Sequence, residues 1–179
     1  MTAAVPVCIG IVTVSDRAAG GVYEDKGGPA IADWLARAVV SPVTLIRRVI
    51  PDGAASVAGV LIQLVDVDGA ELVLVTGGTG PAPRDETPEG VAAVITREYA
   101  GFGEEMRRAS LAEVPTAILS RQTAGSRGKC LIITLPGKPA AIATCLNAVF
   151  AAVPYCLDLL GAGRIETDPA IIAAFRPKA

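Results

Sequence analysis

The sequence predicts a three-layer α/β/α sandwich with a mostly parallel central sheet and one antiparallel hairpin member. Two observations lead to this fold class. Apolar runs of strand length alternate with segments whose apolar residues recur at helical spacing, and the connections between them are short, which is typical of parallel α/β sheets. Later in the chain, two β-rich runs follow each other within residues 116–135 and predict a hairpin.

The first half of the chain supplies strands and helices in alternation. Residues 7–15 are continuously apolar, as in a strand covered on both faces. Pro29 marks the start of a helix over residues 28–40, and Thr87 and Pro88 are residue types preferred at the N-cap and first turn of a helix. The predicted elements are strands over residues 7–15, 43–50 and 71–76 and helices over residues 28–40, 53–66 and 87–99.

The second half predicts a helix over residues 104–112, the hairpin, and a helix over residues 139–160. Pro139 suits the start of that last helix, and a bend is expected before Pro154. The tail after Gly161 is weakly patterned, and we expect it to pack on a neighbouring subunit or to fray. No internal repeat or linker interrupts the pattern, so we expect a single domain over residues 1–179.

Composition excludes several classes of function. The chain has 16 basic and 18 acidic residues and no basic stripe, which argues against nucleic acid as a partner. The absence of histidine excludes Ser-His-Asp and Cys-His mechanisms and histidine-ligated zinc. Its apolar runs of about 10 to 12 residues are too short to cross a membrane, and the N-terminus lacks the basic segment of a signal peptide. These features predict a cytoplasmic protein.

The hydrophobic fraction and the cysteines indicate what lies in the interior and at a subunit surface. Half of the residues, 51%, are hydrophobic, which predicts a subunit interface, with a large core as the alternative. The four cysteines lie inside apolar runs without metal-ligand spacing, so we expect buried, reduced thiols.

In open α/β sheets, ligands bind beyond the carboxyl ends of the strands, which selects the loops over residues 15–28, 51–53, 76–87 and 136–139. The third loop matches neither a Walker A motif nor a dinucleotide fingerprint. Its glycines Gly77, Gly78 and Gly80 nevertheless let backbone N–H groups converge on an anion, and Thr79 adds a hydroxyl. The alternative is a tight turn that uses glycine for geometry alone.

Two aspartates near these loops suggest a cation. Asp85 follows the glycine loop and would repel a phosphate unless a cation lay between them; Mg²⁺, which binds one or two carboxylates together with phosphate oxygens and water, is such a cation. Asp52 ends another predicted strand and reaches the same crevice if the strands are neighbours. The alternatives are an acid that complements a helix dipole for Asp85 and a Pro-Asp-Gly turn for Asp52.

The other loops offer further polar groups. Ser15 and Asp16, at the end of the first strand, suit contacts to ribose, base or phosphate. The segment before residue 139 precedes a helix start whose N–H groups can hold an anion, and residues 120 and 121 offer a hydroxyl and a guanidinium. Each segment also has a purely structural interpretation, as a surface ion pair, a strand-to-helix turn or an exposed polar turn. The candidate residues are Ser15, Asp16, Ser120, Arg121, Pro136, Gly137 and Lys138.

Several segments match a known pattern when they are taken together. They are TGGTGPAPRDETPE, VIPD, AGFGEEMRRASL, VPTAILSRQ, LPGKP and VFAAVPYCLDLL. In combination they resemble the MogA family of molybdopterin adenylyltransferases, which is related to the MoaB proteins and to the G domain of animal gephyrin. The resemblance extends from about residue 7 to about residue 167. Lys138 departs from it, because many relatives have a neutral polar residue there.

The resemblance implies an enzyme of molybdenum cofactor biosynthesis that transfers AMP from ATP to molybdopterin with Mg²⁺ and releases pyrophosphate. It implies that Asp52 and Asp85 are the functional aspartates and that Ser110 and Ser120 lie at pterin-binding positions. It also implies a homotrimer, and a molybdate-insertion protein of the same pathway as a partner. Two alternatives stay open: a non-catalytic, MoaB-like molybdopterin carrier, and a trimeric scaffold.

Overall fold

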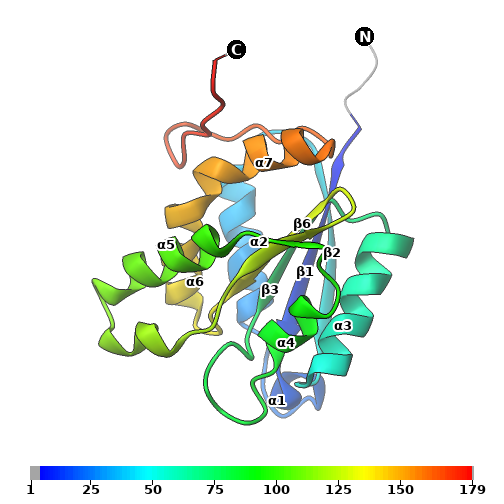
Figure 1. The fold of residues 1–179 in the computed structure, drawn as a ribbon, viewed down its shortest axis with the longest axis vertical. Coiled ribbons are helices and arrows are strands. Elements are labelled where there is room, and N and C mark those ends of the chain that lie inside the picture. Colours follow the sequence, from blue (N-terminus) through cyan, green and yellow to red (C-terminus); the bar gives the residue numbers. More distant parts are fainter. Residues whose placement is uncertain (1–4, 179) are drawn as a thin grey trace.

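The computed structural model describes residues 5–178, and in this part of the chain six strands form one sheet (Figure 1). The strand order is β2-β1-β3-β6-β5-β4. Strands β1, β2, β3 and β6 are mutually parallel, whereas β5 runs antiparallel to β6 and to β4. The strands are β1 Val7–Val14, β2 Val43–Ile50, β3 Leu72–Thr76, β4 Arg97–Glu98, β5 Ala124–Arg127 and β6 Cys130–Leu135. The predicted sheet with one antiparallel member is confirmed.

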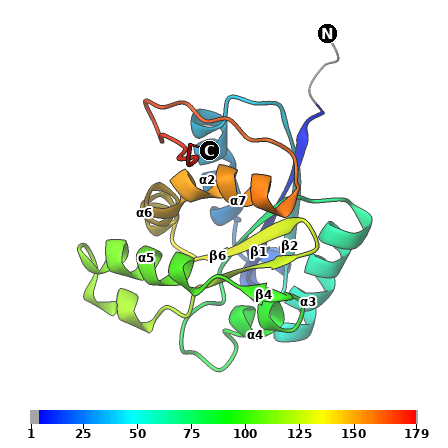
Figure 2. The same cartoon turned by 45° about the horizontal axis from the view of Figure 1, so that its top comes forward.

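Helices cover both faces of the sheet, as Figure 2 shows. One buried cluster joins α2, α5, α6 and α7 to the side of the sheet that includes Ile9, Leu74 and Ile133. A second cluster joins α3 and α4 to the opposite side, which includes Val73 and Ile132. The helices are α1 Asp16–Ala19, α2 Gly27–Ala38, α3 Ala54–Ile62, α4 Thr87–Ala92, α5 Ala100–Leu111, α6 Pro139–Val149 and α7 Val153–Leu160. Alternate residues of the central strands therefore enter two separate cores.

Three predicted elements have clearly different bounds in the structure, namely two helices and the first strand of the hairpin. The helix expected over residues 87–99 ends at Ala92, because the chain then turns to pair with β5: Thr96 N donates to Ser126 O over 2.7 Å, and Tyr99 N donates to Ala124 O over 2.8 Å. The β-branched residues in this stretch favour that extended pairing. The helix expected to begin at residue 104 begins at Ala100 instead.

The first strand of the predicted hairpin begins later than expected. Residues Pro115–Leu119 form a 3₁₀ helix, in which Ala117 N bonds Val114 O over 3.0 Å and Ser120 N bonds Ala117 O over 3.0 Å. Strand β5 starts only at Ala124. Local i to i+3 bonds thus satisfy the backbone where the sequence pattern predicted a strand.

The apolar stretch from Pro139 to Leu160 is long enough to cross a membrane by length and composition alone. In the structure, a 3₁₀ turn over Phe150–Ala152 divides it into α6 and α7, and its buried side chains belong to the core cluster against the sheet. The bend predicted before Pro154 is therefore confirmed, and the stretch is a pair of core helices.

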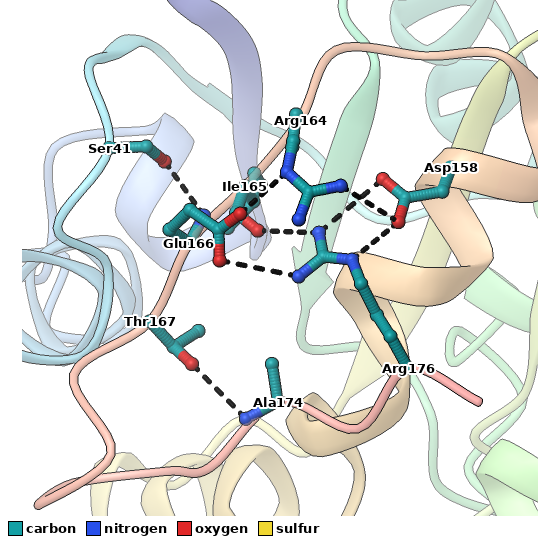
Figure 3. A network of polar contacts seen from close by, with 8 residues as sticks. All are labelled: Ser41, Asp158, Arg164, Ile165, Glu166, Thr167, Ala174 and Arg176. Atoms are coloured by element: carbon teal, nitrogen blue, oxygen red, sulfur yellow. Dashed lines mark hydrogen bonds and ion pairs between the residues drawn. The ribbon is translucent and has the colours of Figure 1, made fainter. Parts of the chain in front are cut away.

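The C-terminal segment packs on its own chain, which corrects the expectation that it frays, while packing on a neighbouring subunit stays a prediction. Figure 3 shows the polar contacts that hold this segment. The Arg176 guanidinium pairs with the carboxylates of Asp158 and Glu166 and donates to Ile165 O over 2.9 Å. The pKa of Arg176 is raised, first by its hydrogen bond to Asp158. These polar contacts, which hydrophobic patterning cannot reveal, hold the segment against α7.

Candidate active site

The loops that follow β1, β3 and β6 lie at one edge of the sheet. The hydroxyl of Thr76 donates to Pro136 O over 2.7 Å, and Gly77 N donates to Leu135 O over 3.3 Å, which ties the loop after β3 to the loop after β6. In Figure 1, the loop between β3 and α4 lies at the same end of the molecule as α1, which follows β1. The loops that the sequence predicts as a ligand site therefore gather at one edge.

The glycine loop has a backbone shape that side chains resist. Gly77 and Gly78 have φ values of 96° and 64°. A Cβ atom at Gly77 would lie 2.3 Å from Val14 O, so only glycine fits there. Thr87 was predicted to cap α4, but its hydroxyl donates instead to Gly77 O over 2.8 Å, and Glu86 occupies the N-cap. Thr87 thus stabilises the glycine loop.

The acidic residues are held by backbone N–H groups. Asp16 and Asp52 form a reciprocal pair, in which each backbone N–H donates to the other's carboxylate over 3.0 Å. Asp85 accepts from Ala82 N over 3.2 Å, and the neighbouring Glu86 accepts from Ala54 N over 2.9 Å at the start of α3. The reach of Glu86 to residue 54 joins the loop of Asp85 to the loop of Asp52.

A magnesium ion would need only part of its ligands from this arrangement. Within residues 5–178, no group of three or more Asp, Glu or Cys side chains is placed to hold a metal ion by itself. Asp52 and Asp85 each use one carboxylate oxygen on a backbone N–H and have a second one. Mg²⁺ commonly binds one or two carboxylates and completes its shell with phosphate oxygens and water, so each aspartate has an oxygen that such a site can use.

A cavity of about 430 Å³ adjoins the glycine loop. It lies between that loop, the end of α5, the 3₁₀ helix and the segment before α6. Of the residues predicted from the sequence, it is lined by Thr79, Gly80, Ser110, Ser120, Pro136, Gly137 and Lys138. The other predicted residues, Ser15, Asp16, Asp52, Gly77, Gly78, Asp85 and Arg121, lie outside its lining. Ser15 caps α1 by accepting from Ala18 N over 3.3 Å.

Arg121 clamps the glycine loop. Its backbone N–H donates to Thr79 O over 2.8 Å, and its Nε donates to Gly80 O over 3.1 Å. The remaining guanidinium donors reach Asp85 O and the Glu89 carboxylate, and this last hydrogen bond is the main reason why the pKa of Glu89 is lowered. Arg121 was predicted to bind an anionic ligand; in the structure its donors are engaged by the loop and by α4.

Known proteins resemble this chain in sequence and in fold. Residues 10–155 match the family model described as a probable molybdopterin binding domain. The chain belongs to this family. It is 50% identical over 182 residues to the molybdopterin adenylyltransferase of Escherichia coli strain K12, covering 95% of this chain and 93% of that protein. Its identity to the Helicobacter pylori strain 26695 enzyme of the same name is 48% over 170 residues, covering 95% and 97%.

A solved structure supports the same family assignment. The molybdopterin biosynthesis Mog protein from Mycobacterium ulcerans superimposes with a TM-score of 0.79 at 37% identity, covering 86% of this chain and 99% of that one. The resemblance expected from the sequence motifs is therefore confirmed at the level of the family.

The structure adds a residue to this family site that the motifs did not single out. Gln122 lines the cavity and is only 3% exposed. Its amide accepts a hydrogen bond from the Ser120 hydroxyl and donates to Cys145 Sγ over 3.3 Å. Burial raises the pKa of the Cys145 thiol, which Ser110 Oγ also approaches to 3.6 Å. The sequence contained one signal for Gln122: it lies two residues after Ser120, and alternate residues of an extended chain share a face.

Proposed function

We propose that this chain is a molybdopterin adenylyltransferase that transfers AMP from ATP to the terminal phosphate of molybdopterin during molybdenum cofactor biosynthesis. The observation that supports it most is the meeting of a ligand-sized cavity with the glycine loop, whose following residues include Asp85. The family assignment and the names of the relatives support the same reaction.

The reaction suits a site without a general base. A phosphate oxygen of molybdopterin attacks the α-phosphorus of ATP, a new P–O bond forms, and the bond to the β-phosphate oxygen breaks to release pyrophosphate. The attacking phosphate is already ionised at neutral pH, so the absence of histidine from the chain is no obstacle. Catalysis then depends on alignment and on neutralising charge.

Each loop has a role in this proposal. Asp52 and Asp85 would hold Mg²⁺, which offsets the charge of the triphosphate when it is bound. Asp16 holds the backbone of residue 52 in place, and Ser15 caps the helix α1 that Asp16 begins. The N–H groups of residues 78–80 and the segment Pro136–Lys138 hold anionic oxygens, and Gly77, whose own N–H donates to Leu135 O, shapes the loop. Ser110 and Ser120 contact the pterin. Arg121 keeps the glycine loop in its conformation.

An assay with purified protein, molybdopterin, ATP and Mg²⁺ tests this proposal through formation of adenylylated molybdopterin and pyrophosphate. Asp85→Asn keeps an oxygen that can accept from Ala82 N but removes the charge, so we expect a folded protein with at least a roughly hundredfold slower transfer, on the order of other losses of electrostatic stabilisation. Asp33→Asn, an exposed acid on α2, is the matched control. Normal turnover by Asp85→Asn would refute its role.

The same assay separates the alternatives. A carrier would bind molybdopterin without producing adenylylated pterin, and a scaffold would bind neither substrate. We infer a cytoplasmic enzyme. Because its product is an activated form of the pterin, we also infer that this product passes to a molybdate-insertion protein.

We also infer a homotrimer that forms through an apolar groove of about 570 Å³ between α5 and α7. Tyr99, Phe102, Tyr155 and Leu159 line it, and Leu159 is 69% exposed. Light scattering should give three times the 18.2 kDa chain mass. Leu159→Glu should lower that mass, whereas Val67→Glu, at an equally exposed position on another face, should not. A monomeric wild-type protein would contradict the trimer.

A further inference from the structure

Gln122 forms a buried link between the cavity and the core. Its side chain approaches the cavity from the segment that leads into β5, and its backbone is fixed by Arg107, whose guanidinium donates to Gln122 O over 2.8 Å. At 3% exposure the amide is shielded from bulk water, so its two polar ends must be satisfied by neighbours.

Both ends of the amide are engaged. Oε1 accepts from the Ser120 hydroxyl, and Nε2 donates to Cys145 Sγ over 3.3 Å. In this orientation the Ser120 hydroxyl meets the amide oxygen, which is a strong acceptor, and the amide N–H meets the thiol sulfur. Cys145, which is fully buried in α6, is thus the partner of Nε2 while the amide oxygen is turned toward Ser120.

This orientation determines what Ser120 can offer to a ligand. A serine hydroxyl has one proton, and here that proton is given to Gln122. Thr79 Oγ1, 3.5 Å from Ser120 Oγ, is a second and more distant acceptor for the same proton, so the closer Gln122 takes it. Ser120 also lines the cavity. It can accept a hydrogen bond from an N–H group of a ligand, but it cannot donate to a phosphate oxygen.

We propose that Gln122 is a positioning residue that fixes the Ser120 hydroxyl as a hydrogen-bond acceptor, and that it thereby directs the N–H donors of the pterin to this part of the cavity. The anionic oxygens are left to the glycine loop and to the segment around Lys138. The inference rests on the proposed function, because it assigns a role within the same site.

The test is a double-mutant cycle. Gln122→Met keeps the length of the side chain but removes the acceptor, so the Ser120 proton is released and the KM for molybdopterin should rise about tenfold, as for loss of one oriented hydrogen bond. The KM for ATP should not change. In a Ser120→Ala background, Gln122→Met should change the KM for molybdopterin by less than about twofold, because Gln122 acts through Ser120. An equal rise in both backgrounds would show a merely structural role and overturn the proposal.

A second pair of variants tests the same idea without altering Gln122. Cys145→Ala removes the acceptor for Nε2 and should raise the KM for molybdopterin severalfold, whereas Cys145→Ser keeps an acceptor and should restore it. Equal KM values for these two variants would contradict the anchoring role of Cys145, and with it the proposal, even if Gln122→Met failed to fold.

Direct binding of molybdopterin, measured by its fluorescence without ATP, separates this inference from the proposed function. If the wild type binds molybdopterin but transfers no AMP, the proposed function fails, and the effect of Gln122→Met on binding still decides the inference. If the wild type transfers AMP and Gln122→Met binds molybdopterin as tightly as the wild type, only the inference fails. A wild type that binds no molybdopterin refutes both.

Discussion

Replacing Gly77 by alanine should be costlier than the same change at another glycine of positive φ. At Gly77, φ is 96° and the added Cβ would lie 2.3 Å from the carbonyl oxygen of Val14. That oxygen belongs to β1, which pairs with β2 on one side and β3 on the other. The sheet therefore resists the movement of about 1 Å that an ordinary contact distance would require.

Gly69 provides the matched control. Its φ is 73°, and no atom lies within 4 Å of a Cβ built there, so Gly69→Ala tests the backbone cost alone. That cost is about 1–2 kcal/mol for a left-handed residue, offset by about 0.4–1 kcal/mol from the stiffer unfolded chain. Gly77→Ala adds the cost of overpacking, about 1–3 kcal/mol. We expect Gly69→Ala to destabilise by about 1 kcal/mol and Gly77→Ala by about 2–4 kcal/mol.

Urea unfolding followed by circular dichroism measures both free energies of unfolding, and equal slopes against denaturant would show that the two variants expose the same surface. The folded Gly77→Ala protein should also lose AMP transfer, because the loop must move away from Val14. If Gly77→Ala costs no more than Gly69→Ala, the close contact with β1 does not constrain the loop and this reasoning is wrong.

Two further predictions concern charged side chains. Arg176→Met removes the bonds to Asp158 and to Ile165 O, so it should destabilise by about 2 kcal/mol and lower Tm by about 4–8 °C; an unchanged Tm would show that the C-terminal segment adds no stability. The pKa of Glu89 lies below its ordinary value of 4.5 because of Arg121, so the stability from this pair is present above pH 4.5 and is lost as pH falls through the lowered pKa. Titration followed by NMR should show the Glu89 pKa returning toward 4.5 in Arg121→Met, and an unshifted value would contradict the clamp.

The parts of the fold that could be predicted from the sequence are those in which burial alone decides the structure. Strand β3 is buried at every position, and its continuous apolar run indicates as much. The prediction that the helix continues beyond Ala92 is wrong, because this segment pairs with the backbone of Ser126 and Ala124, about 30 residues away in the chain. The β-branched residues of the stretch favour extended chain, but the local sequence does not indicate which strand is its partner.

The candidate site likewise contains residues that the local sequence indicates and residues whose roles depend on distant partners. Gly77 was predictable because a glycine directly after a buried strand is typical of a tight turn or a close backbone approach, and the structure provides the contact with Val14 that requires it. Gln122 ends the motif VPTAILSRQ and lies two residues after Ser120, but its partner Cys145 lies 23 residues further along the chain, so the local sequence does not indicate its role. Likewise, the use of Arg121 as a clamp depends on carbonyl oxygens of a loop about 40 residues earlier. Residue type suggests a chemistry, whereas partners decide whether a group is free to perform it.

The acidic residues at the sheet edge show how the proposed metal site is prepared. Like charges gathered near an anion-binding loop would repel one another and the substrate, yet each of these carboxylates accepts a hydrogen bond from a backbone N–H. The carboxylates of Glu86 and Asp16 join neighbouring loops. Asp52 and Asp85 each use one carboxylate oxygen on a backbone N–H and have a second oxygen. These bonds join the loops to one another. If Asp52 and Asp85 hold a cation as proposed, charge neutralisation would need little rearrangement of the protein at the moment of transfer, which is the condition under which fixed charges contribute most to catalysis.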